Sequence, residues 1–543
     1  MSLIIVSLSG ESADAVRADM TAAIEAGADM IELRLDLMPD LTDEDIRGLR
    51  AAFTDGPPII LTYRSPAEGG GDSATDAARM ARLDELGPTF DYIDVEIATW
   101  ERSEESRRIA TAAMRRADVV SQTGGVEMIE GGSRRKLILS RHDDKGRPAS
   151  LQADLVRMCE EEACDVPKLA WRARSVRDNF EAFELLRLSP RPAITVCMGE
   201  DGRLSRILCR KFGAFATFAS LRHGDETAPG QLTIRELRDG FRWSRIGSAT
   251  HLYGVLGDPI GHSISPDVQN AAFDRTGRDA VYVPIRVTAG PESFKAFMVE
   301  VLARPWLDFR GFSVTIPHKE NAWRFVNERG RLMDEASREC GAVNTLKLCP
   351  DGVVEGWNTD SAAVTGAVSD ALGTEQLPAG LSALVLGSGG MARAAAYALS
   401  KAGARVTIAG RNEPSARAIA DRFGCSVCAW PERDRVSCDL ILNCTPIGMH
   451  PLTDQSPVSP AALRGGRMVF DSIYFPLQTR LLREAAQAGC RVISGADLFA
   501  HQAVAQFTIW TGEDVARSVF HEMTAKAIID REIRSRAAAE IDR

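Results

Sequence analysis

The sequence predicts an α/β fold: an N-terminal (β/α)8 barrel followed by a two-lobed α/β unit with a Rossmann nucleotide-binding lobe. Two observations lead to this prediction. Residues 1–245 alternate short apolar segments of strand length with stretches of helix length. Residues 383–393 place a strand, a glycine turn and a helix in the order of a dinucleotide-binding fingerprint. The chain has 543 residues, too many for one ordinary core, and usual domain sizes suggest about three units.

The composition narrows the class of protein. The chain has no apolar run of membrane-spanning length, and no basic region precedes the strand-like segment 3–8, so we expect neither a signal peptide nor a membrane partner. Acidic and basic residues are interleaved at a net charge of −10, which argues against nucleic-acid binding. Eleven scattered cysteines favour a reducing, cytoplasmic location. The C-x-x-C of Cys425 and Cys428 has no second pair nearby, so we expect no metal site.

Eight apolar segments predict the strands of the barrel. Catalytic groups of such barrels gather at the carboxyl ends of the strands, so polar residues there should converge. They include Glu32, Arg34, Arg64, Glu96, His142 and Lys168. The predicted strands are 3–9, 30–36, 58–64, 90–97, 136–142, 165–171, 192–198 and 216–222.

Lys168 and His142 are candidates for covalent chemistry. Lys168 lies in D-V-P-K-L-A, which otherwise has the pattern of a buried strand. A buried lysine is costly unless it is paired or neutral, and a neutral amine is a nucleophile toward carbonyls. His142 could move protons beside the resulting imine. Each residue also fits a simpler interpretation on its own: a strand-end lysine that reaches solvent, and a hydrogen-bonded histidine at the rim.

Six motifs, in order, resemble those of the type I 3-dehydroquinate dehydratases. They are E-L-R-L-D at 32–36, T-Y-R-S-P-A-E-G-G at 62–70, S-R-H-D at 140–143, K-L-A at 168–170, M-G-E-D-G-R-L-S-R at 198–206 and A-P-G-Q at 228–231. The resemblance implies that Lys168 forms a Schiff base, that His142 is the general acid/base and that Glu68 orients it. It also implies a set of residues that bind the substrate carboxylate and hydroxyls: Glu32, Arg34, Arg64, Arg206, Thr227 and Gln231. Pro167 and Thr227 depart from the family pattern, which usually has an aliphatic residue and a serine there.

The barrel should end near the junction of the two parts. We expect an amphipathic helix over Leu232–Trp243 and a boundary near 245–250, with only a short connection. A new strand begins at Tyr253. It leads through a Gly/Pro turn to Ser265 and Pro266, which fit an N-cap followed by the first helical residue. The hydroxyls of Ser263 and Ser265 fit carboxylate binding equally well.

Residues 311–319, G-F-S-V-T-I-P-H-K, predict a half-buried strand from Phe312 to Ile316 that ends at Pro317. Lys319 should then lie on the short connection that follows, where catalytic groups are common.

Further on, Gly387, Gly389 and Ala392 fit the G-x-G-x-x-A fingerprint. The next strand ends in Gly410 and Arg411. An arginine there suits a 2′-phosphate, which favours NADP over NAD.

This second part resembles the shikimate dehydrogenases. The motifs are G-D-P-I-G-H-S-I-S-P at 257–266, the stretch 311–319, G-A-V-N-T at 341–345, G-W-N-T-D at 356–360, N-C-T-P-I-G-M at 443–449, D-S-I-Y-F-P-L-Q-T at 471–479 and G-A-D-L-F-A-H-Q-A at 495–503. The resemblance implies Lys319 and Asp360 as the catalytic pair. It implies substrate contacts from Ser263, Ser265, Thr315, Asn344, Tyr474 and Gln502. It implies a cofactor site lined by Gly387, Ser388, Gly389, Gly390, Met391, Arg411, Thr445, Met449 and Gly495.

The resemblance also implies how this part is divided. A substrate-binding lobe at 250–357 would be completed by residues 491–522, and the Rossmann lobe would span 358–490. The charged tail 523–543 suits a solvated helix. Gly410 departs from the family pattern, which usually has an asparagine there, and this leaves the strictness of cofactor choice open.

The two resemblances together imply a bifunctional enzyme that dehydrates 3-dehydroquinate to 3-dehydroshikimate and then reduces that product to shikimate with NADPH. One alternative is a second half that uses NAD and prefers quinate, against which Arg411 and the pair of serines argue. Another is a regulatory sensor that binds these ligands without turnover. A sensor predicts damaged catalytic positions, whereas Lys168, His142, Lys319 and Asp360 are all present.

Overall fold

The chain divides into two compact units, Met1–Thr250 and His251–Arg543. The computed structural model describes residues 2–102, 104–113, 135–261 and 263–541. All eight predicted barrel strands are present in the first unit, and neighbours pair in parallel in the order β7-β6-β5-β4-β3-β2-β1-β8. Their bounds are β1 Leu3–Leu8, β2 Met30–Arg34, β3 Ile59–Thr62, β4 Tyr92–Glu96, β5 Lys136–Asp143, β6 Cys164–Arg172, β7 Ile194–Met198 and β8 Ala216–Ser220.

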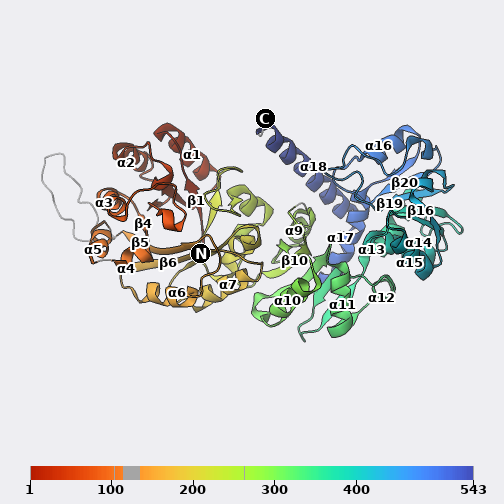
Figure 1. Cartoon of the computed structure of the whole chain (residues 1–543), viewed down its shortest axis with the longest axis horizontal. Helices are drawn as coiled ribbons and strands as arrows, with labels where there is room; N and C mark the ends of the chain where they lie inside the picture. The colour runs from red at the N-terminus through yellow and green to blue at the C-terminus, as the bar shows by residue number, and fades with distance from the viewer. Residues whose placement is uncertain (1, 103, 114–134, 262, 542–543) are drawn as a thin grey trace. The chain divides into compact units, whose positions relative to one another are not determined.

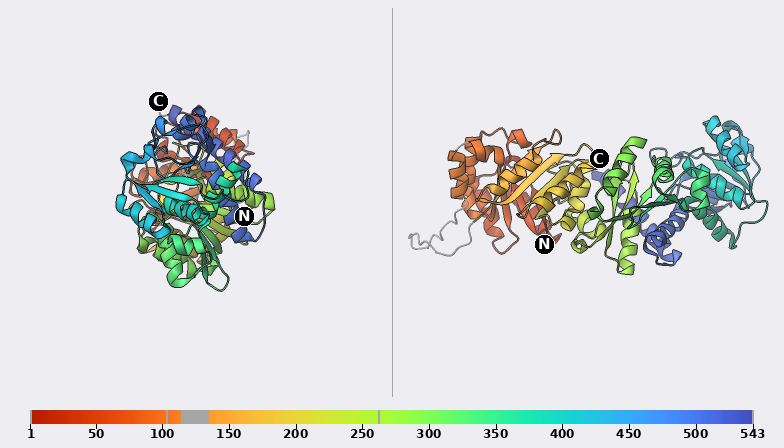
Figure 2. Two further views of the ribbon diagram at one scale, coloured as in Figure 1. Left: turned by 90° about the vertical axis from the view of Figure 1, so that its right-hand side faces the viewer. Right: turned by 90° about the horizontal axis from the view of Figure 1, so that it is seen from below.

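The sheet closes into a barrel with helices on its outside (Figures 1 and 2). The backbone N–H of Phe215, just before β8, donates to the carbonyl of Ala193, just before β7, at 2.8 Å. This bond lies between the starts of β7 and β8, the two ends of that strand order, and so closes the ring. The helices are α1 Ala13–Glu25, α2 Asp43–Ala52, α3 Asp76–Leu86, α4 Ile97–Arg102, α5 Glu104–Ala113, α6 Leu151–Glu160, α7 Asp178–Leu188 and α8 Arg203–Ile207.

The inside of the barrel changes from apolar to polar along the strands. Every strand contributes to one apolar layer, made of Ile5, Met30, Ile60, Tyr92, Ile138, Val166, Ile194 and Ala216. Because side chains alternate along a strand, the residues two positions further on face the same interior. Six of them are polar: Ser7, Glu32, Thr62, Asp94, Ser140 and Lys168. The polar layer lies toward the carboxyl ends, where barrel enzymes place their chemistry.

The helix predicted over Leu232–Trp243 is wrong at both ends, since a continuous run of helical turns covers only residues 234–240. Leu232 instead begins a short strand, β9 (Leu232–Thr233), which pairs with β8 and is followed by short turns of helix. The pairing buries Leu232 completely. The left-handed backbone of Arg242, with φ of 53°, interrupts the helical turns before Trp243. Sheet pairing therefore overrides the helical periodicity of this segment.

The first lobe of the second unit is a mixed sheet in the order β11-β10-β12-β14-β15-β13. The prediction for β12 (Phe309–Val314) needs correction, because the strand ends at Val314 rather than at Ile316. Its burial does not alternate either: Phe312, Ser313 and Val314 are all buried. Both faces of the strand are covered, because Phe297 packs on Phe312 from one side and Gln506 accepts from Ser313 on the other. The other elements are β10 His251–Gly257, β11 Ala280–Arg286, β13 Arg331–Leu332, β14 Thr345–Leu348, β15 Val354–Trp357, α9 Ser265–Thr276, α10 Pro291–Leu302, α11 Lys319–Arg329 and α12 Glu335–Cys340.

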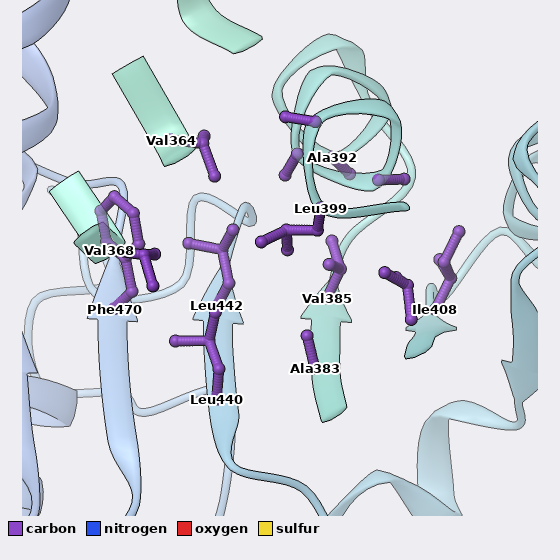
Figure 3. Packing of buried hydrophobic residues seen from close by; sticks show 14 of the residues in the cluster. Val364, Val368, Ala383, Val385, Ala392, Leu399, Ile408, Leu440, Leu442 and Phe470 are labelled. Carbon is purple, nitrogen blue, oxygen red and sulfur yellow. The ribbon is translucent and has the colours of Figure 1, made fainter. Parts of the chain in front are cut away.

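The second lobe has six parallel strands in the order β18-β17-β16-β19-β20-β21, the doubly wound order of dinucleotide-binding folds. Apolar side chains of its central strands pack under α13 and α14 (Figure 3), and they include Ala383, Val385, Leu440, Leu442 and Phe470. The alternate residues of β16, Leu384 and Leu386, fill a second core on the other face. The elements are β16 Ser382–Leu386, β17 Arg405–Ala409, β18 Ser426–Cys428, β19 Leu440–Asn443, β20 Met468–Asp471, β21 Arg491–Ile493, α13 Thr359–Leu372, α14 Gly390–Lys401, α15 Glu413–Phe423 and α16 Arg480–Gln487.

The last two helices, α17 (Gly495–Thr511) and α18 (Arg517–Ile541), pack against the first lobe. Trp510 of α17 donates through its indole N–H to the carbonyl of Leu346 at 2.9 Å. The expected solvated tail is partly buried, since α18 continues through residue 523 and Ile528 lies in this core. Residues 542–543 of the predicted tail lie outside the described residues. Within the part of the chain that the structure describes, no helix combines the length and apolar character needed to cross a membrane.

Candidate active sites

Lys168 lies inside the barrel on β6, with 5% of its surface exposed. Its Nζ donates a hydrogen bond to Asp94 Oδ2 at 2.9 Å and lies 3.8 Å from Glu32 Oε1. The ring centroid of Phe218 lies 4.3 Å from the same nitrogen. The structure therefore contradicts the simpler interpretation of a lysine that reaches solvent. The cost of burying this amine is offset by its carboxylate partner.

Asp94 of β4 joins Lys168 to Arg64. Arg64 donates through Nη2 to Asp94 Oδ1 at 2.9 Å and through Nη1 to Ser140 Oγ at 2.7 Å. Burial alone would raise the pKa of Asp94, but Arg64 and Lys168 outweigh it and hold this pKa well below its usual range. The interior of the barrel therefore contains an ionised carboxylate between two cationic side chains.

His142, near the end of β5, pairs with Glu68 from the loop after β3. Glu68 Oε2 accepts a hydrogen bond from the His142 backbone N–H at 2.9 Å and lies 3.1 Å from the ring Nδ1. Burial raises the pKa of Glu68 to about 7. Burial, reinforced by Arg64 and Lys168, holds the pKa of His142 well below its ordinary value. The imidazole is therefore neutral near pH 7, where Glu68 changes its charge.

Glu32 and Arg34, two of the predicted substrate contacts, already have protein partners. Glu32 accepts hydrogen bonds from Ser7 Oγ at 2.5 Å and from Thr62 Oγ1 at 2.8 Å. Arg34 forms a bidentate pair with Asp36 at 2.9 and 2.7 Å. These hydrogen bonds fix the side chains of Glu32 and Arg34 in single orientations at the polar end of the barrel.

Arg206, Thr227 and Gln231 complete the predicted barrel set. Arg206 is 1% exposed. It donates to the carbonyl of Phe218 at 3.4 Å, and within the described residues its Nε has no hydrogen-bond partner. Burial lowers the pKa of Arg206 to about 10. Thr227 and Gln231 bond to each other, with Gln231 Nε2 donating to Thr227 Oγ1 at 3.1 Å. Arg206 is the one cation of these three residues, and its burial suits it to bind an anionic ligand.

Sequence reasoning missed Asp94 and Ser140, and it expected Glu96 at this face without giving it a role. The signal was present, because Asp94 and Glu96 are two residues apart on β4 and therefore face the same interior. On each of the eight predicted strands, every second residue faces the interior. Selecting these residues on all eight strands would have identified the whole polar layer. The carboxylate next to the buried lysine was thus detectable without knowledge of the family.

Lys319 and Asp360 meet in the second unit. Lys319 Nζ donates to Asp360 Oδ2 at 2.6 Å, and Asn344 Nδ2 donates to Asp360 Oδ1 at 2.8 Å. Lys319 is the first residue of α11 rather than part of a loop, which corrects the sequence-based placement. Asp360 is buried, whereas the side chain of Lys319 is 18% exposed. A Cβ placed on Gly390, at the start of α14, would lie 4.0 Å from Lys319 Cδ, so the lysine faces the glycine turn.

The hydroxyl of Ser263 donates to that of Ser265 at 3.1 Å. The predicted N-cap is wrong, because α9 begins at Ser265 with Ile264 as its cap residue, and no side chain caps the helix. The oxygen of Ser263 instead accepts from the backbone N–H of Ser265 at 3.2 Å. Capping therefore does not explain this pair of hydroxyls. Thr315, Tyr474 and Gln502, three further predicted substrate contacts, are partly exposed.

The glycine turn after β16 leaves room for a dinucleotide. Gly387 has a φ of 121°, and a Cβ there would lie 2.9 Å from the carbonyl oxygen of Cys444. A Cβ on Gly389 would meet nothing within 4 Å. The amino end of α14 follows, so its backbone N–H groups are directed at the space that a pyrophosphate would occupy. Ser388 lies against Gly410, where a Cβ would lie 3.1 Å from the Ser388 Cβ. These residues fit NADP.

The remaining predicted cofactor residues differ in their surroundings. Arg411 is exposed, and Met449 is 44% exposed. Met391 packs against the Rossmann core instead of standing free. Thr445 donates through Oγ1 to Asn443 Oδ1 at 2.7 Å. A Cβ on Gly495 would collide with the backbone of Ile473, which explains why α17 starts with a glycine there.

Asp471 is a further buried group that the sequence analysis did not single out. It accepts from Asn443 Nδ2 at 2.9 Å and from Thr479 Oγ1 at 2.7 Å. Burial raises the pKa of Asp471 to about 6. It connects the two loops, 443–449 and 471–479, that carry predicted cofactor and substrate residues.

Family models match both units of the chain. The model of type I 3-dehydroquinase matches residues 4–248, and that of the shikimate dehydrogenase substrate binding domain matches 255–346. A model described as NADP oxidoreductase, coenzyme F420-dependent, matches 383–462.

Similar proteins cover the whole chain or its second unit. A bifunctional 3-dehydroquinate dehydratase/shikimate dehydrogenase of Arabidopsis thaliana, a chloroplastic protein, is 33% identical over 97% of this chain and 84% of its own. A shikimate dehydrogenase (NADP(+)) of Methanothermobacter thermautotrophicus is 37% identical over 53% of this chain and 100% of its own. Among solved structures, the dehydroquinate dehydratase and shikimate dehydrogenase from S. pombe is 26% identical with a TM-score of 0.41, covering 96% of this chain and 98% of its own.

Proposed function

Because the chain belongs to the family of bifunctional 3-dehydroquinate dehydratases/shikimate dehydrogenases, we propose that Lys168 and His142 perform the dehydration and that Lys319 and Asp360 serve the reduction. The chain has both activities of the family, and shikimate and dehydroquinate are its substrate class. One observation carries the assignment of roles: each unit holds a lysine paired with a buried aspartate. The two lysine side chains differ in exposure, 6% for Lys168 and 18% for Lys319.

In the barrel, the ammonium of Lys168 passes a proton to neutral His142, and the free amine attacks the substrate ketone. His142 returns that proton to the oxygen that leaves as water, and the iminium that remains acts as an electron sink. His142, neutral near pH 7, takes the proton from the adjacent carbon. The electron pair then expels the hydroxyl, which leaves as water with a proton returned by His142. Hydrolysis of the imine releases the enone and regenerates the amine. Glu68 fixes the ring of His142 during both proton transfers.

The substrate carboxylate is held by arginine in this proposal. Arg206 supports that role, because its buried guanidinium lacks a carboxylate partner within the described residues. Arg34 and Arg64 bear carboxylate partners and serve to shape the pocket around the hydroxyls, together with Glu32. Thr227 and Gln231 close the pocket beside them.

In the second unit, NADPH supplies the hydride when bound. Lys319 gives a proton to the oxygen that becomes the hydroxyl of shikimate, and Asp360 keeps the ammonium oriented through its 2.6 Å contact. Asn344 holds Asp360 in turn. Ser263 and Ser265 bind the carboxylate, with Thr315, Tyr474 and Gln502 around the ring. Gly387, Gly389 and Gly390 admit the pyrophosphate, and Ser388, Met391, Thr445, Met449 and Gly495 surround the cofactor.

Borohydride reduction tests the covalent role of Lys168. Reduction in the presence of 3-dehydroquinate should add the mass of the reduced ligand to the intact chain, and peptide mapping should place it at Lys168. Reduction without the ligand is the control. An unchanged mass would contradict the Schiff base, and a modified peptide elsewhere would contradict the assignment to Lys168.

The dehydration should depend on pH through Glu68. The carboxylate accepts from His142, so the orienting contact is complete above the Glu68 pKa of about 7 and lost as pH falls below it. We expect kcat/KM for dehydration to fall with acidification through this pH. Glu68→Gln keeps a hydrogen-bond acceptor but cannot ionise, so its profile should lack this limb. A limb near pH 7 that persists in Glu68→Gln would assign it to another group.

Arg411 should set the preference for NADPH over NADH. Loss of a charge-assisted contact to the 2′-phosphate costs about 1.5–3 kcal/mol, so Arg411→Ala should raise KM for NADPH about 10- to 100-fold. KM for NADH should hardly change. Arg417, which pairs with Glu413 on the exposed face of α15, offers a matched control as Arg417→Ala. Equal losses with both cofactors would show that Arg411 does not bind the 2′-phosphate.

The alternative of a second unit that uses NAD and prefers quinate has its own test. Rates with quinate and with shikimate are compared under each cofactor.

The cytoplasmic location and the lack of a nucleic-acid partner remain proposals, based on the cysteine and charge patterns. The plant relative is named chloroplastic. Cell fractionation with an antibody to the chain tests the location.

A further inference from the structure

A buried arginine holds the carboxyl end of β3 without entering the proposed chemistry. Arg79 of α3 is 2% exposed. Its Nη1 donates to Glu96 Oε2 at 2.9 Å and to the carbonyl of Tyr63 at 2.7 Å. Glu96 uses its other oxygen, Oε1, to accept from the backbone N–H of Ser65 at 2.7 Å.

These contacts fall on both sides of Arg64. Tyr63 supplies the carbonyl just before it, and Ser65 supplies the N–H just after it. The Arg79–Glu96 pair therefore fixes the backbone from which the Arg64 side chain extends. The Nη1 atom of Arg64 also lies 3.6 Å from Glu96 Oε1 and 3.8 Å from Glu68 Oε2.

We propose that Arg79 is a positioning residue of the dehydratase: paired with Glu96, it fixes the backbone that presents Arg64 and Glu68 to the substrate and to His142. The proposal rests on the functional roles given above to Arg64 and Glu68. Removing the guanidinium would leave Glu96 buried with Arg64 as its nearest cation. Because an uncompensated buried charge is costly, Arg64 would be drawn toward Glu96 and away from Asp94.

The other end of the same two strands provides a matched control. Arg50 of α2 donates to the carbonyl of Phe53 at 3.0 Å and to Asp91 at 3.4 Å. Asp91 accepts from the backbone N–H of Ile59 at 3.0 Å. Arg50 and Asp91 thus brace the amino ends of β3 and β4 much as Arg79 and Glu96 brace the carboxyl ends. A purely structural role predicts similar consequences at both ends.

Arg79→Lys and Arg50→Lys should therefore be compared in the full chain. A misplacement of about 1 Å costs roughly 10²-fold in rate, so Arg79→Lys should lower dehydratase kcat/KM by about 10- to 100-fold. Arg50→Lys should leave it within about twofold, as expected for a site away from the chemistry. Shikimate oxidation, measured on the same samples, should be unchanged in both. Equal dehydratase rates for the two variants would overturn the proposal.

The pH profile separates positioning from stability. Glu68 faces Arg64 at the end of β3, Glu96 and Asp94 on β4, and His142 on β5. Lysine at position 79 keeps the charge but not the guanidinium geometry that reaches both Glu96 and the Tyr63 carbonyl, so Glu96 draws on Arg64 instead. Arg64 then stabilises ionised Glu68 less, so the acid limb of kcat/KM should move to higher pH in Arg79→Lys and stay in place in Arg50→Lys. An unmoved limb in Arg79→Lys would count against the proposal.

Two further variants keep the test decisive. If the Arg79→Lys barrel does not fold, Glu96→Gln, which keeps the side-chain volume, should show the same loss of dehydration. A fully active Glu96→Gln would then overturn the proposal. Glu68→Ala, which removes the acceptor beside His142, is assayed alongside and tests the premise. If Glu68→Ala is fully active, the functional role of Glu68 fails; if only Arg79→Lys and Glu96→Gln are fully active, the positioning role alone fails.

Discussion

Lys168→Ala should abolish the conversion of 3-dehydroquinate to 3-dehydroshikimate while leaving NADP-dependent oxidation of shikimate nearly intact. The amine is the group that becomes covalent, and loss of such a nucleophile lowers kcat by about 10⁴-fold or more. Asp94 keeps Arg64 as a partner at 2.9 Å, so the substitution does not leave this carboxylate unpaired. The measurement is a pair of assays on one sample, absorbance of the enone for the first reaction and of NADPH for the second.

A second lysine of the barrel provides the control for this substitution. Lys136 lies at the amino end of β5, donates to the hydroxyl of Tyr92 at 3.2 Å and is far along the strand from His142. Lys136→Ala should keep both activities. Loss of both activities in Lys168→Ala would show that the two units do not work independently, and retained dehydration would exclude the imine.

The barrel could be predicted in detail because its signals are local. Each of the eight strands is a short apolar run, and the polar residues near their ends mark the face where the chemistry lies. The buried lysine was recognisable from its strand, D-V-P-K-L-A, alone. The strand of the lysine alone did not give its partner, because Asp94 is 74 residues away along the chain. Asp94 emerges only when positions of the same parity are compared on all eight strands, since these face one interior.

Two of the three errors have a common physical cause. Leu232–Trp243 has the periodicity of a helix, but pairing with β8 and burial of Leu232 made its start a strand. Ser265 has the residue type of an N-cap, yet the chain enters α9 one residue earlier. In the tail, charged residues suggested a solvated helix, while Ile528 packs on the first lobe. For Leu232 and Ile528, a tertiary contact outweighed a preference of a few tenths to about 1 kcal/mol, the usual size of local propensities.

The Lys319–Asp360 pair shows what the structure adds to the sequence. By residue type alone, this pair resembles Lys401–Glu335, another lysine–carboxylate pair of the same unit. The two contacts have nearly equal lengths, 2.6 and 2.7 Å. They differ in burial, because the Asp360 side chain is 2% exposed whereas that of Glu335 is 56% exposed. A buried, hydrogen-bonded carboxylate holds an ammonium in one place, whereas an exposed pair is screened by solvent and has no fixed geometry.

Lys319→Met should therefore lower the rate of shikimate oxidation, and of the reverse reduction, by about 10²- to 10⁴-fold, the usual contribution of a positioned general acid or base. The methionine keeps the length of the side chain but cannot move a proton, so KM for NADPH should change little. Lys401→Met is the matched control and should leave the rate unchanged. Dehydration in the same samples should be unaffected by either substitution. If both variants lost the dehydrogenase rate equally, or if Lys319→Met raised only KM, the proton-transfer role of Lys319 would be contradicted.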